Sequence, residues 1–215
     1  MHCAVIFDMD GTLFDTEAVF QKYWNEIASE RGIALSEHFK YEICGTSGVP
    51  MNRVIERHYG VTDGTEIQME CKRRVAEELA RGVPLKPGCM EILECFYKKK
   101  IPMAIGSSSR RVQIERNLSV SGTAHYFSAI ASGDEVERGK PFPDIFLLAS
   151  ERLGALPGEC FVFEDSPNGI RAAHRAGMKP ILIPDLMPAG EEIRAISCGV
   201  YSTLTEAMEL VIGGQ

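Results

Sequence analysis

Residues 4–12, AVIFDMDGT, join a short apolar run to two aspartates, Asp8 and Asp10. The run from Ala4 to Phe7 contains β-branched and aromatic residues and does not alternate with polar ones, which is typical of a strand buried on both faces. In a parallel sheet, ligands bind beyond the carboxyl ends of the strands. The stretch therefore predicts a buried parallel strand whose carboxyl end presents two carboxylates.

Four further apolar runs of this kind follow along the chain, at residues 101–105, 127–131, 160–163 and 180–183. Helical patterns lie between them, at residues 112–118, 144–153 and 170–176. Strands that alternate with helices predict right-handed βαβ units and a parallel sheet with helices on both faces. The expected fold class is therefore α/β, with a Rossmann-like core.

The segment between the first two strands, residues 15–85, breaks this alternation and carries no convincing strand. Its apolar residues repeat at helical spacing in three places, around Phe20–Ile27, Val54–Tyr59 and Met69–Leu79. Proline and glycine signals near residues 84–88 then mark the return to the sheet. We expect a catalytic core of residues 1–14 and 86–215, with residues 15–85 forming a helical cap domain inserted after the first strand.

The two aspartates of the opening stretch lie two residues apart in a still-extended chain and can project to the same side. One of Asp8 and Asp10 can attack a phosphorus atom, and the other can handle the proton of the leaving group. A hairpin turn is the alternative, because Asp10-Gly11 is a common turn signal. A turn explains neither Asp8 nor the helical segment that follows, so the stretch favours a catalytic site.

Two further segments carry groups that suit a phosphate. Ser107, Ser108 and Ser109 follow the second apolar run, where a hydroxyl and backbone amides at a helix N-terminus can bind phosphate oxygens. Lys140 lies between a glycine and a proline, and its ammonium can neutralise a phosphate and a nearby carboxylate. A plain helix cap and a solvated loop lysine are the alternatives, and taken singly they are the commoner roles.

Glu164 and Asp165 end the fourth apolar run, followed by Ser166. Carboxylate oxygens suit Mg²⁺, which usually takes one or two carboxylates together with water and substrate oxygens. A strand end with a capping acid is the alternative. All four sets of residues follow predicted strands, where they can converge, and together they supply a nucleophile, an acid/base, phosphate donors, a cation and metal ligands. Their coincidence favours one active site.

Four motifs extend this pattern over almost the whole chain: DMDGTLFDTE (8–17), GSSSR (106–110), RGKPFPD (138–144) and FEDSPNGIRAAHRAGM (163–178). Together they resemble the haloacid dehalogenase-like hydrolase superfamily, in its branch with a helical cap after the first strand. Within that branch, the β-phosphoglucomutase-like and phosphoglycolate phosphatase-like proteins are the most similar. The resemblance implies a magnesium-dependent phosphohydrolase that forms a transient aspartyl-phosphate.

The resemblance also implies roles for individual residues. Asp8 would be the nucleophile and Asp10 the general acid/base. The phosphate-binding set would be Ser107, Ser108 and Lys140. The Mg²⁺ ligands would be Asp8, the backbone carbonyl of Asp10 and Asp165, with Glu164 assisting directly or through water.

Composition limits the partners. The net charge of −7 disfavours nonspecific binding to nucleic acid or anionic membranes, and no apolar run approaches the length of a membrane span. The seven cysteines are odd in number and form no CxxC pair, so a disulfide framework and a zinc site are both unfavoured. The start of the chain lacks the basic region of a signal peptide. We expect a cytoplasmic protein, monomeric or weakly homo-oligomeric, that acts on a small phosphorylated metabolite.

Three functions remain open at this point. Hydrolysis of a small phosphomonoester is favoured over a β-phosphoglucomutase-like transfer, because the resembling mutases place a histidine where Phe20 stands and a cap arginine where Gly48 stands. The loop around Gly48 (residues 45–48) is polar and is a candidate to face the substrate. A noncatalytic binding protein on the same fold is the third hypothesis, which the presence of all four residue sets disfavours.

Overall fold

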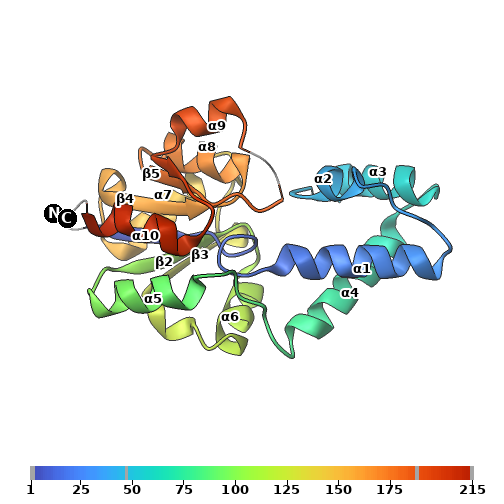
Figure 1. The fold of residues 1–215 in the computed structure, drawn as a ribbon, viewed down its shortest axis with the longest axis horizontal. Coiled ribbons are helices and arrows are strands. Elements are labelled where there is room, and N and C mark those ends of the chain that lie inside the picture. Colours follow the sequence, from blue (N-terminus) through green and yellow to red (C-terminus); the bar gives the residue numbers. More distant parts are fainter. Residues whose placement is uncertain (1–2, 47, 187–188, 214–215) are drawn as a thin grey trace. The chain divides into compact units, whose positions relative to one another are not determined.

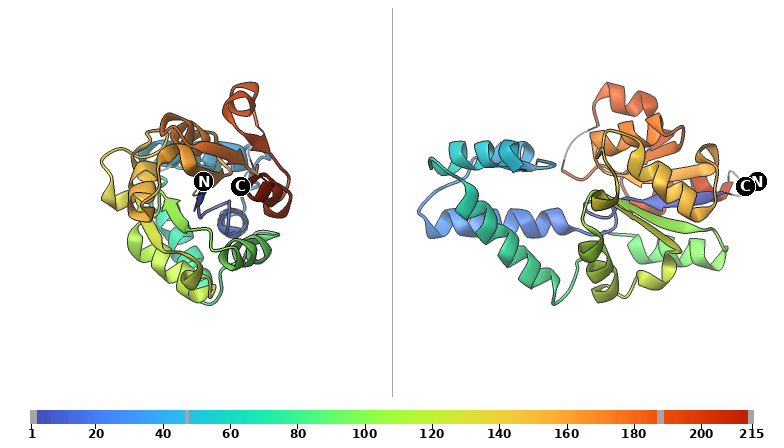
Figure 2. Two further views of the ribbon diagram at one scale, coloured as in Figure 1. Left: turned by 90° about the vertical axis from the view of Figure 1, so that its left-hand side faces the viewer. Right: turned by 180° about the vertical axis from the view of Figure 1, so that it is seen from behind.

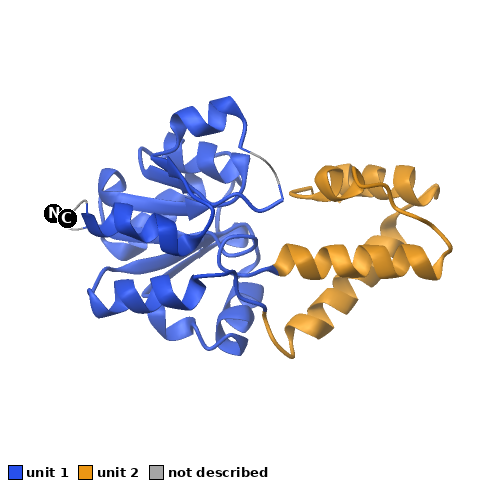
Figure 3. Ribbon diagram, viewed as in Figure 1, with its two compact units in different colours: residues 1–15, 84–215 blue, residues 16–83 orange. Residues whose placement is uncertain are grey.

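The computed structural model describes residues 3–46, 48–186 and 189–213. The chain divides into two compact units (Figure 3): a core unit, Met1–Asp15 with Pro84–Gln215, and an inserted unit, Thr16–Val83. Asp15 N–H donates to the Pro84 carbonyl at 2.8 Å, so the two connections between the units leave the core unit side by side. The sequence pattern predicts the insertion at residues 15–85.

The core unit contains a six-stranded parallel sheet in the order β3-β2-β1-β4-β5-β6 (Figure 1). The strands are β1 Ala4–Phe7, β2 Met103–Ser107, β3 Ala129–Ser132, β4 Cys160–Glu164, β5 Lys179–Leu182 and β6 Gly199–Val200. The chain builds β2 and β3 on one side of β1 and then crosses to the other side with β4. This reversal puts the topological switch point between β1 and β4, where ligands bind in open α/β sheets.

Helices cover both faces of this sheet (Figure 2). They are α5 Cys89–Lys98, α6 Arg111–Val120, α7 Asp144–Leu153, α8 Pro167–Arg175, α9 Glu191–Ile196 and α10 Leu204–Gly213. Ile6 of β1 packs in a cluster with Phe146 of α7, whereas Phe7 points to the opposite face and contacts Phe96 of α5 at a ring distance of 6.3 Å. Both faces of β1 are therefore buried, and the predicted Rossmann-like α/β class is confirmed.

Two differences from the predicted elements have local causes. The second strand begins at Met103 rather than residue 101, because Ile101 N–H still donates to the Phe96 carbonyl and completes the end of α5. The strand β6 is only two residues long, so it produces no apolar run that a pattern could detect. The helix predicted at 144–153 matches α7, which ends at Gly154 with a φ of 66°.

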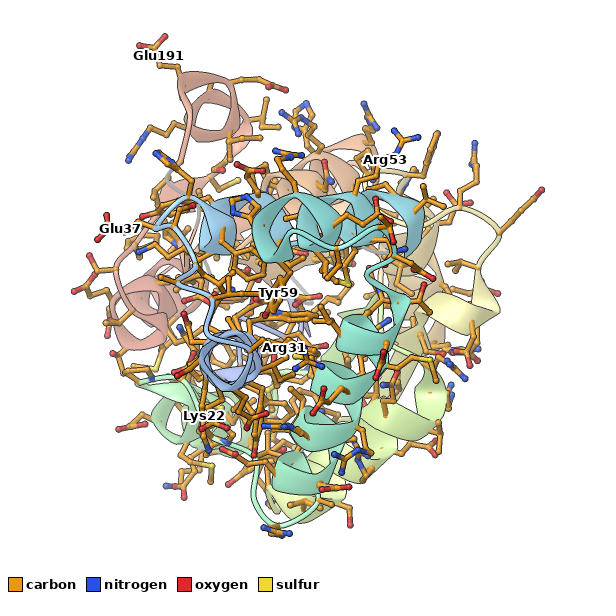
Figure 4. The ribbon with its side chains drawn as sticks, turned by 90° about the vertical axis from the view of Figure 1, so that its right-hand side faces the viewer. Lys22, Arg31, Glu37, Arg53, Tyr59 and Glu191 are labelled. Carbon is orange, nitrogen blue, oxygen red and sulfur yellow. The ribbon has the colours of Figure 1, made fainter. Side chains whose placement is uncertain are left out.

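The inserted unit consists of helices: α1 Thr16–Glu30, α2 Phe39–Ile43, α3 Gly48–Tyr59 and α4 Thr65–Leu79. Trp24 of α1, Phe39 of α2 and Tyr59 of α3 form its aromatic centre, with Trp24–Phe39 and Phe39–Tyr59 ring distances of 6.0 and 5.9 Å. Tyr59 lies between α1 and α3 (Figure 4) and donates its hydroxyl hydrogen to the Trp24 carbonyl at 2.6 Å.

The described part of this unit, residues 16–46 and 48–83, contains no strand, as the helical spacing predicts. The polar loop predicted at residues 45–48 is shorter than expected, because Gly48 is the first residue of α3. Ser47 of that loop lies outside the described residues. Within the three described ranges of the chain, no helix has the length and apolar character needed to cross a bilayer.

Candidate active site

The loop after β1 is held by its own backbone and by β4. Asp8 N–H donates to the Phe163 carbonyl at 2.9 Å, and Gly11 N–H donates to the Phe14 carbonyl at 2.9 Å. Gly11 has a φ of 88°, and a Cβ at this position would lie 2.6 Å from Asp165 Oδ2. Glycine is therefore needed for the turn and for the approach of Asp165. The turn leads into α1 and not into a hairpin.

Lys140 is buried between two carboxylates. Its ammonium donates to Asp8 Oδ1 and, at 2.6 Å, to Glu164 Oε1, and it lies 4.8 Å from the centre of the Phe146 ring. The exposed fractions of the Lys140, Asp8 and Glu164 side chains are 8%, 9% and 1%. Burial alone lowers the pKa of Lys140, but the two carboxylates outweigh it and raise that pKa. Lys140 is thus a charged, buried group and not a solvated loop lysine.

The loop that carries Lys140 is anchored on both sides. Arg175 of α8 donates to the Pro141 carbonyl at 2.8 Å. Arg138 makes two hydrogen bonds of 3.1 Å to the Asp144 carboxylate at the start of α7. These contacts hold the lysine loop against the helices that flank β1 and β4.

Glu164 uses both carboxylate oxygens inside the protein. Oε1 accepts from Lys140, and Oε2 accepts from the backbone N–H and the hydroxyl of Ser166, both at 2.8 Å. A Cβ at Gly169 would lie 1.7 Å from Oε1, so only glycine leaves room for this carboxylate. In this arrangement Glu164 orients Lys140, whereas the resemblance gave it a direct or water-mediated contact with the metal. Ser166 is also the N-cap of α8.

The carboxylates outnumber the cations at this site. Burial, followed by the charges of Glu164 and Asp10, raises the pKa of Asp8 to about 8 against the opposing effect of Lys140. Burial and the charges of Glu164 and Asp8 raise the pKa of Asp165 well above its ordinary value. A further cation would relieve this repulsion, because an opposite charge nearby favours the ionised form of a carboxyl group.

Hard oxygen donors of this kind fit Mg²⁺, which needs only one or two carboxylates from the protein. Thr12 donates to Asp165 Oδ1 at 2.8 Å and so orients that carboxylate. In the described residues, no three His, Cys, Asp or Glu side chains form a ready-made metal cluster. The carboxylates of Asp8 and Asp165 match the one or two protein carboxylates that Mg²⁺ usually takes.

The serines after the second apolar run have three different environments. Ser107 is the last residue of β2 and is 1% exposed, and its Oγ accepts from Ser109 N–H at 3.1 Å. Ser108 is exposed. Ser109 donates its hydroxyl hydrogen to Asp10 Oδ2 at 2.7 Å. The helix cap alternative does not apply to them, because the N-cap of α6 is Arg110.

The structure thus brings together Asp8, Lys140, Glu164 and Asp165 at the ends of β1 and β4, and it connects Asp10 to the end of β2. Ser109 was a candidate only as part of the hydroxyl run, and its contact with Asp10 was not predicted. The hydroxyl run in residues 107–109 was the available signal, but nothing in it shows which serine faces a carboxylate.

The chain belongs to the haloacid dehalogenase-like hydrolases, whose family model matches residues 5–183. The resemblance drawn from the motifs is therefore confirmed.

Individual relatives narrow the class. The chain is 35% identical over 192 residues to a probable pseudouridine-5'-phosphatase of Drosophila melanogaster, which covers 86% of this chain and 81% of the relative. It is 34% identical over 187 residues to fructose-1-phosphate phosphatase of Escherichia coli, covering 84% and 95%. A crystal structure of a candidate β-phosphoglucomutase from Thermotoga maritima superposes with a TM-score of 0.78 at 29% identity, covering 99% of both chains. The prediction of a hydrolase acting on phosphomonoesters is confirmed.

Proposed function

We propose that this protein is a magnesium-dependent phosphatase that hydrolyses a sugar phosphate or a similar small metabolite through an aspartyl-phosphate on Asp8. The observation that carries the proposal is the buried Asp8–Lys140–Glu164 network at the switch point of the sheet. The names of the relatives, a pseudouridine-5'-phosphatase and a fructose-1-phosphate phosphatase, support a phosphorylated sugar or nucleoside as substrate.

In the first step, a carboxylate oxygen of Asp8 attacks the phosphorus while the bond from phosphorus to the leaving oxygen breaks. Asp10 gives a proton to that oxygen, so the product leaves as an alcohol. Lys140 lies against Asp8 and can stabilise the negative charge on the transferring group, and Ser107 and Ser108 are proposed to bind its oxygens.

In the second step, water attacks the phosphorus of the aspartyl-phosphate and restores the Asp8 carboxylate. Asp10, now deprotonated, accepts a proton from that water. Glu164 keeps Lys140 in place through both steps, because its other oxygen is fixed by Ser166.

Mg²⁺ would be held by the carboxylates of Asp8 and Asp165 and by the backbone carbonyl of Asp10. When bound, it neutralises negative charge around the phosphoryl group. The surplus of carboxylates described above is the support for this assignment, together with the placement of Asp165 by Thr12.

The inserted unit is proposed to act as the cap, which excludes water in the first step and contacts the leaving group. We also propose a cytoplasmic location, because the seven cysteines are odd in number and form no CxxC pair, which disfavours a disulfide framework and suits a reducing compartment. The enzyme is proposed to act as a monomer or weak homo-oligomer.

The purified protein should hydrolyse 4-nitrophenyl phosphate with Mg²⁺ and stop when excess chelator is added. Asp8→Asn should abolish turnover with the fold intact, because an amide cannot accept the phosphoryl group. Asp63→Asn, a change of an exposed aspartate in the inserted unit, is the matched control and should keep wild-type activity. Full activity of Asp8→Asn, or of the wild type in metal-free buffer, would contradict the proposal.

A second assay separates hydrolysis from phosphoryl transfer to a sugar. Phe20 and Gly48 occupy the positions where the resembling mutases carry a histidine and an arginine, so hydrolysis should prevail. The protein is given β-glucose 1-phosphate with a trace of the glucose bisphosphate. Release of free phosphate supports the phosphatase, whereas rapid formation of glucose 6-phosphate with little free phosphate would replace it by the mutase.

A further inference from the structure

The turn after β2 is bonded directly to the loop after β1. Ser109 Oγ donates to Asp10 Oδ2 at 2.7 Å, across 99 positions of sequence. The contact exists because β1 and β2 are neighbours in the sheet, with Phe7 opposite Ile105. A hydroxyl donor therefore contacts the side chain to which the proposed mechanism gives both proton transfers.

The backbone of Ser109 is fixed from two sides. Its N–H donates to Ser107 Oγ at 3.1 Å, and its carbonyl accepts from Gly133 N–H at 3.0 Å. A Cβ at Gly133 would lie 2.2 Å from the Ser108 carbonyl oxygen, so the end of β3 packs closely against this turn. The Ser109 hydroxyl thus projects from a rigid support.

The backbone of Asp10 is fixed by hydrogen bonds of its loop. Gly11 N–H donates to the Phe14 carbonyl at 2.9 Å, and the amides of Leu13 and Phe14 donate to the Met9 carbonyl at 3.1 and 3.0 Å. These bonds place the Cα of Asp10, whereas the carboxyl torsion of an aspartate is broad. A general acid works only within hydrogen-bond reach of the reacting oxygen, so a neighbour that restricts this torsion affects the proton transfer.

We propose that Ser109 is a positioning residue that orients the Asp10 carboxyl group for proton transfer, an inference that rests on the proposed function. In the step it serves, an Asp8 oxygen bonds to phosphorus, the bond from phosphorus to the leaving oxygen breaks, and the Asp10 proton moves to that oxygen. Ser109 acts through Asp10 and exchanges no proton with the substrate. Its contribution is therefore largest for esters whose leaving oxygen must be protonated.

Two esters with different leaving groups test this inference. Benzyl phosphate releases an alkoxide and needs the acid, whereas 4-nitrophenyl phosphate releases a stable phenolate and does not. Ser109→Ala should lower kcat/KM for benzyl phosphate about tenfold, a part of the ~10²–10⁴ that a positioned acid supplies, and change it less than about twofold for 4-nitrophenyl phosphate. Asp10→Asn should show the same selectivity with a larger loss. Ser109→Thr, which keeps the hydroxyl, should restore the ratio.

The controls separate orientation from other roles. Ser119→Ala, an exposed serine on α6, should leave both esters unchanged. Adding Ser109→Ala to Asp10→Asn should cause no further selective loss, because the two residues act as one unit. Should Ser109→Ala lower the melting temperature, Ser109→Cys repeats the assay with a weak donor of similar size.

An equal loss for both esters would overturn the inference in favour of direct phosphate binding by Ser109, and so would unchanged kinetics. Failure of the proposed function has a different signature. In that case Asp8→Asn stays active, or Asp10→Asn shows no preference between the two esters while Ser109 is intact.

Discussion

The core unit and the inserted unit place their charges in opposite environments. In the core, Lys140 joins Asp8 and Glu164 where all three side chains are at most 9% exposed. In the inserted unit, Arg74 of α4 joins Glu30 and Glu70 at 2.6 Å on the surface, and Glu30 is 51% exposed. In each unit one cation contacts two carboxylates, and in the inserted unit Arg31 also pairs with Glu70 at 2.9 Å. The main difference between the two networks is burial.

Burial decides what such a network can do. A buried charge must be paired because it has lost its water, and its pairs are strong in a low dielectric. An exposed pair is screened and contributes little to stability. The buried network suits chemistry on a charged phosphate, whereas the exposed network only links the surfaces of helices α1 and α4. Charge alone therefore does not mark the active site; charge at a strand end inside the protein does.

Replacing Lys140 or Arg74 with methionine should give the largest difference between the two networks. Lys140→Met leaves two buried carboxylates without their partner, which should cost about 3–5 kcal/mol of unfolding free energy. It should also lower kcat about 10²–10³-fold, as loss of a charge-stabilising donor does. Arg74→Met should cost far less and leave kcat unchanged. Urea unfolding and assays of both variants measure this; equal destabilisation would mean that burial does not separate the two networks.

Two glycines sharpen the comparison. A Cβ at Gly169 would lie 1.7 Å from Glu164 Oε1, so Gly169→Ala must displace the carboxylate that orients Lys140. We expect Gly169→Ala to lower the free energy of unfolding by about 3 kcal/mol, which is typical of overpacking, and to lower kcat as well. Gly82 of the inserted unit has no atom within 4 Å of such a Cβ, and Gly82→Ala should stay within about 0.5 kcal/mol of the wild type. If Gly169→Ala kept the stability and activity of the wild type, the Glu164 carboxylate would have an alternative position that still supports Lys140.

The sequence allowed the sheet to be predicted better than the contacts of the site. The parallel strands appear as separate apolar runs, and Pro143 and Gly154 bound α7 clearly. The apolar runs do not show which side chains far apart in the sequence contact each other. Lys140 lies 132 positions from Asp8 and 24 from Glu164, and a solvated loop was the commoner expectation for such a lysine.

The sequence patterns also do not predict the direction in which each side chain of the site points. The resemblance implies a direct or water-mediated contact of Glu164 with the metal, but it does not give the partners of the Glu164 side chain, which depend on Ser166 and on the space left by Gly169. The bond from Ser109 to Asp10 likewise needs the strand neighbours β1 and β2 in register, which local patterns do not fix.

The aromatic centre of the inserted unit should respond locally. Tyr59→Phe removes the hydrogen bond of 2.6 Å to the Trp24 carbonyl and keeps the ring packing with Phe39. The expected cost is about 1 kcal/mol, the usual net worth of one hydrogen bond. Hydrogen exchange should accelerate in α1 and α3 and not in the sheet. Faster exchange throughout β1 and β4 would show that the two units do not unfold separately.

The smallest expected effect is on the stability of the protein at acid pH. It tests whether the exposed ion-pair networks of the two units respond to pH in the same way. After β3 in the core unit, Glu135 accepts from Arg152 at 2.8 and 2.9 Å, and these bonds, with those from Ser132 and Arg111, hold its pKa well below its usual range. In the inserted unit, Arg31 and then Arg74 lower the pKa of Glu70. A carboxyl group with a lowered pKa in the folded state stabilises the protein above its unfolded pKa.

This stabilisation should decline as the pH falls below about 4.3, where the unfolded glutamate takes up a proton but the folded one does not. Replacing Glu135 by glutamine removes the titrating group. The free energy of unfolding of Glu135→Gln should therefore fall less steeply between about pH 6 and pH 3 than that of the wild type. Glu70→Gln should flatten the curve in the same direction, and both effects should shrink in high salt because the pairs are exposed. Urea unfolding at each pH measures the slopes. If unfolding free energy depended on pH in the same way for Glu135→Gln and the wild type, the arginines would not be stabilising the Glu135 carboxylate. With Glu70→Gln still flattening the curve, the ion pairs of the two units would differ although both are exposed.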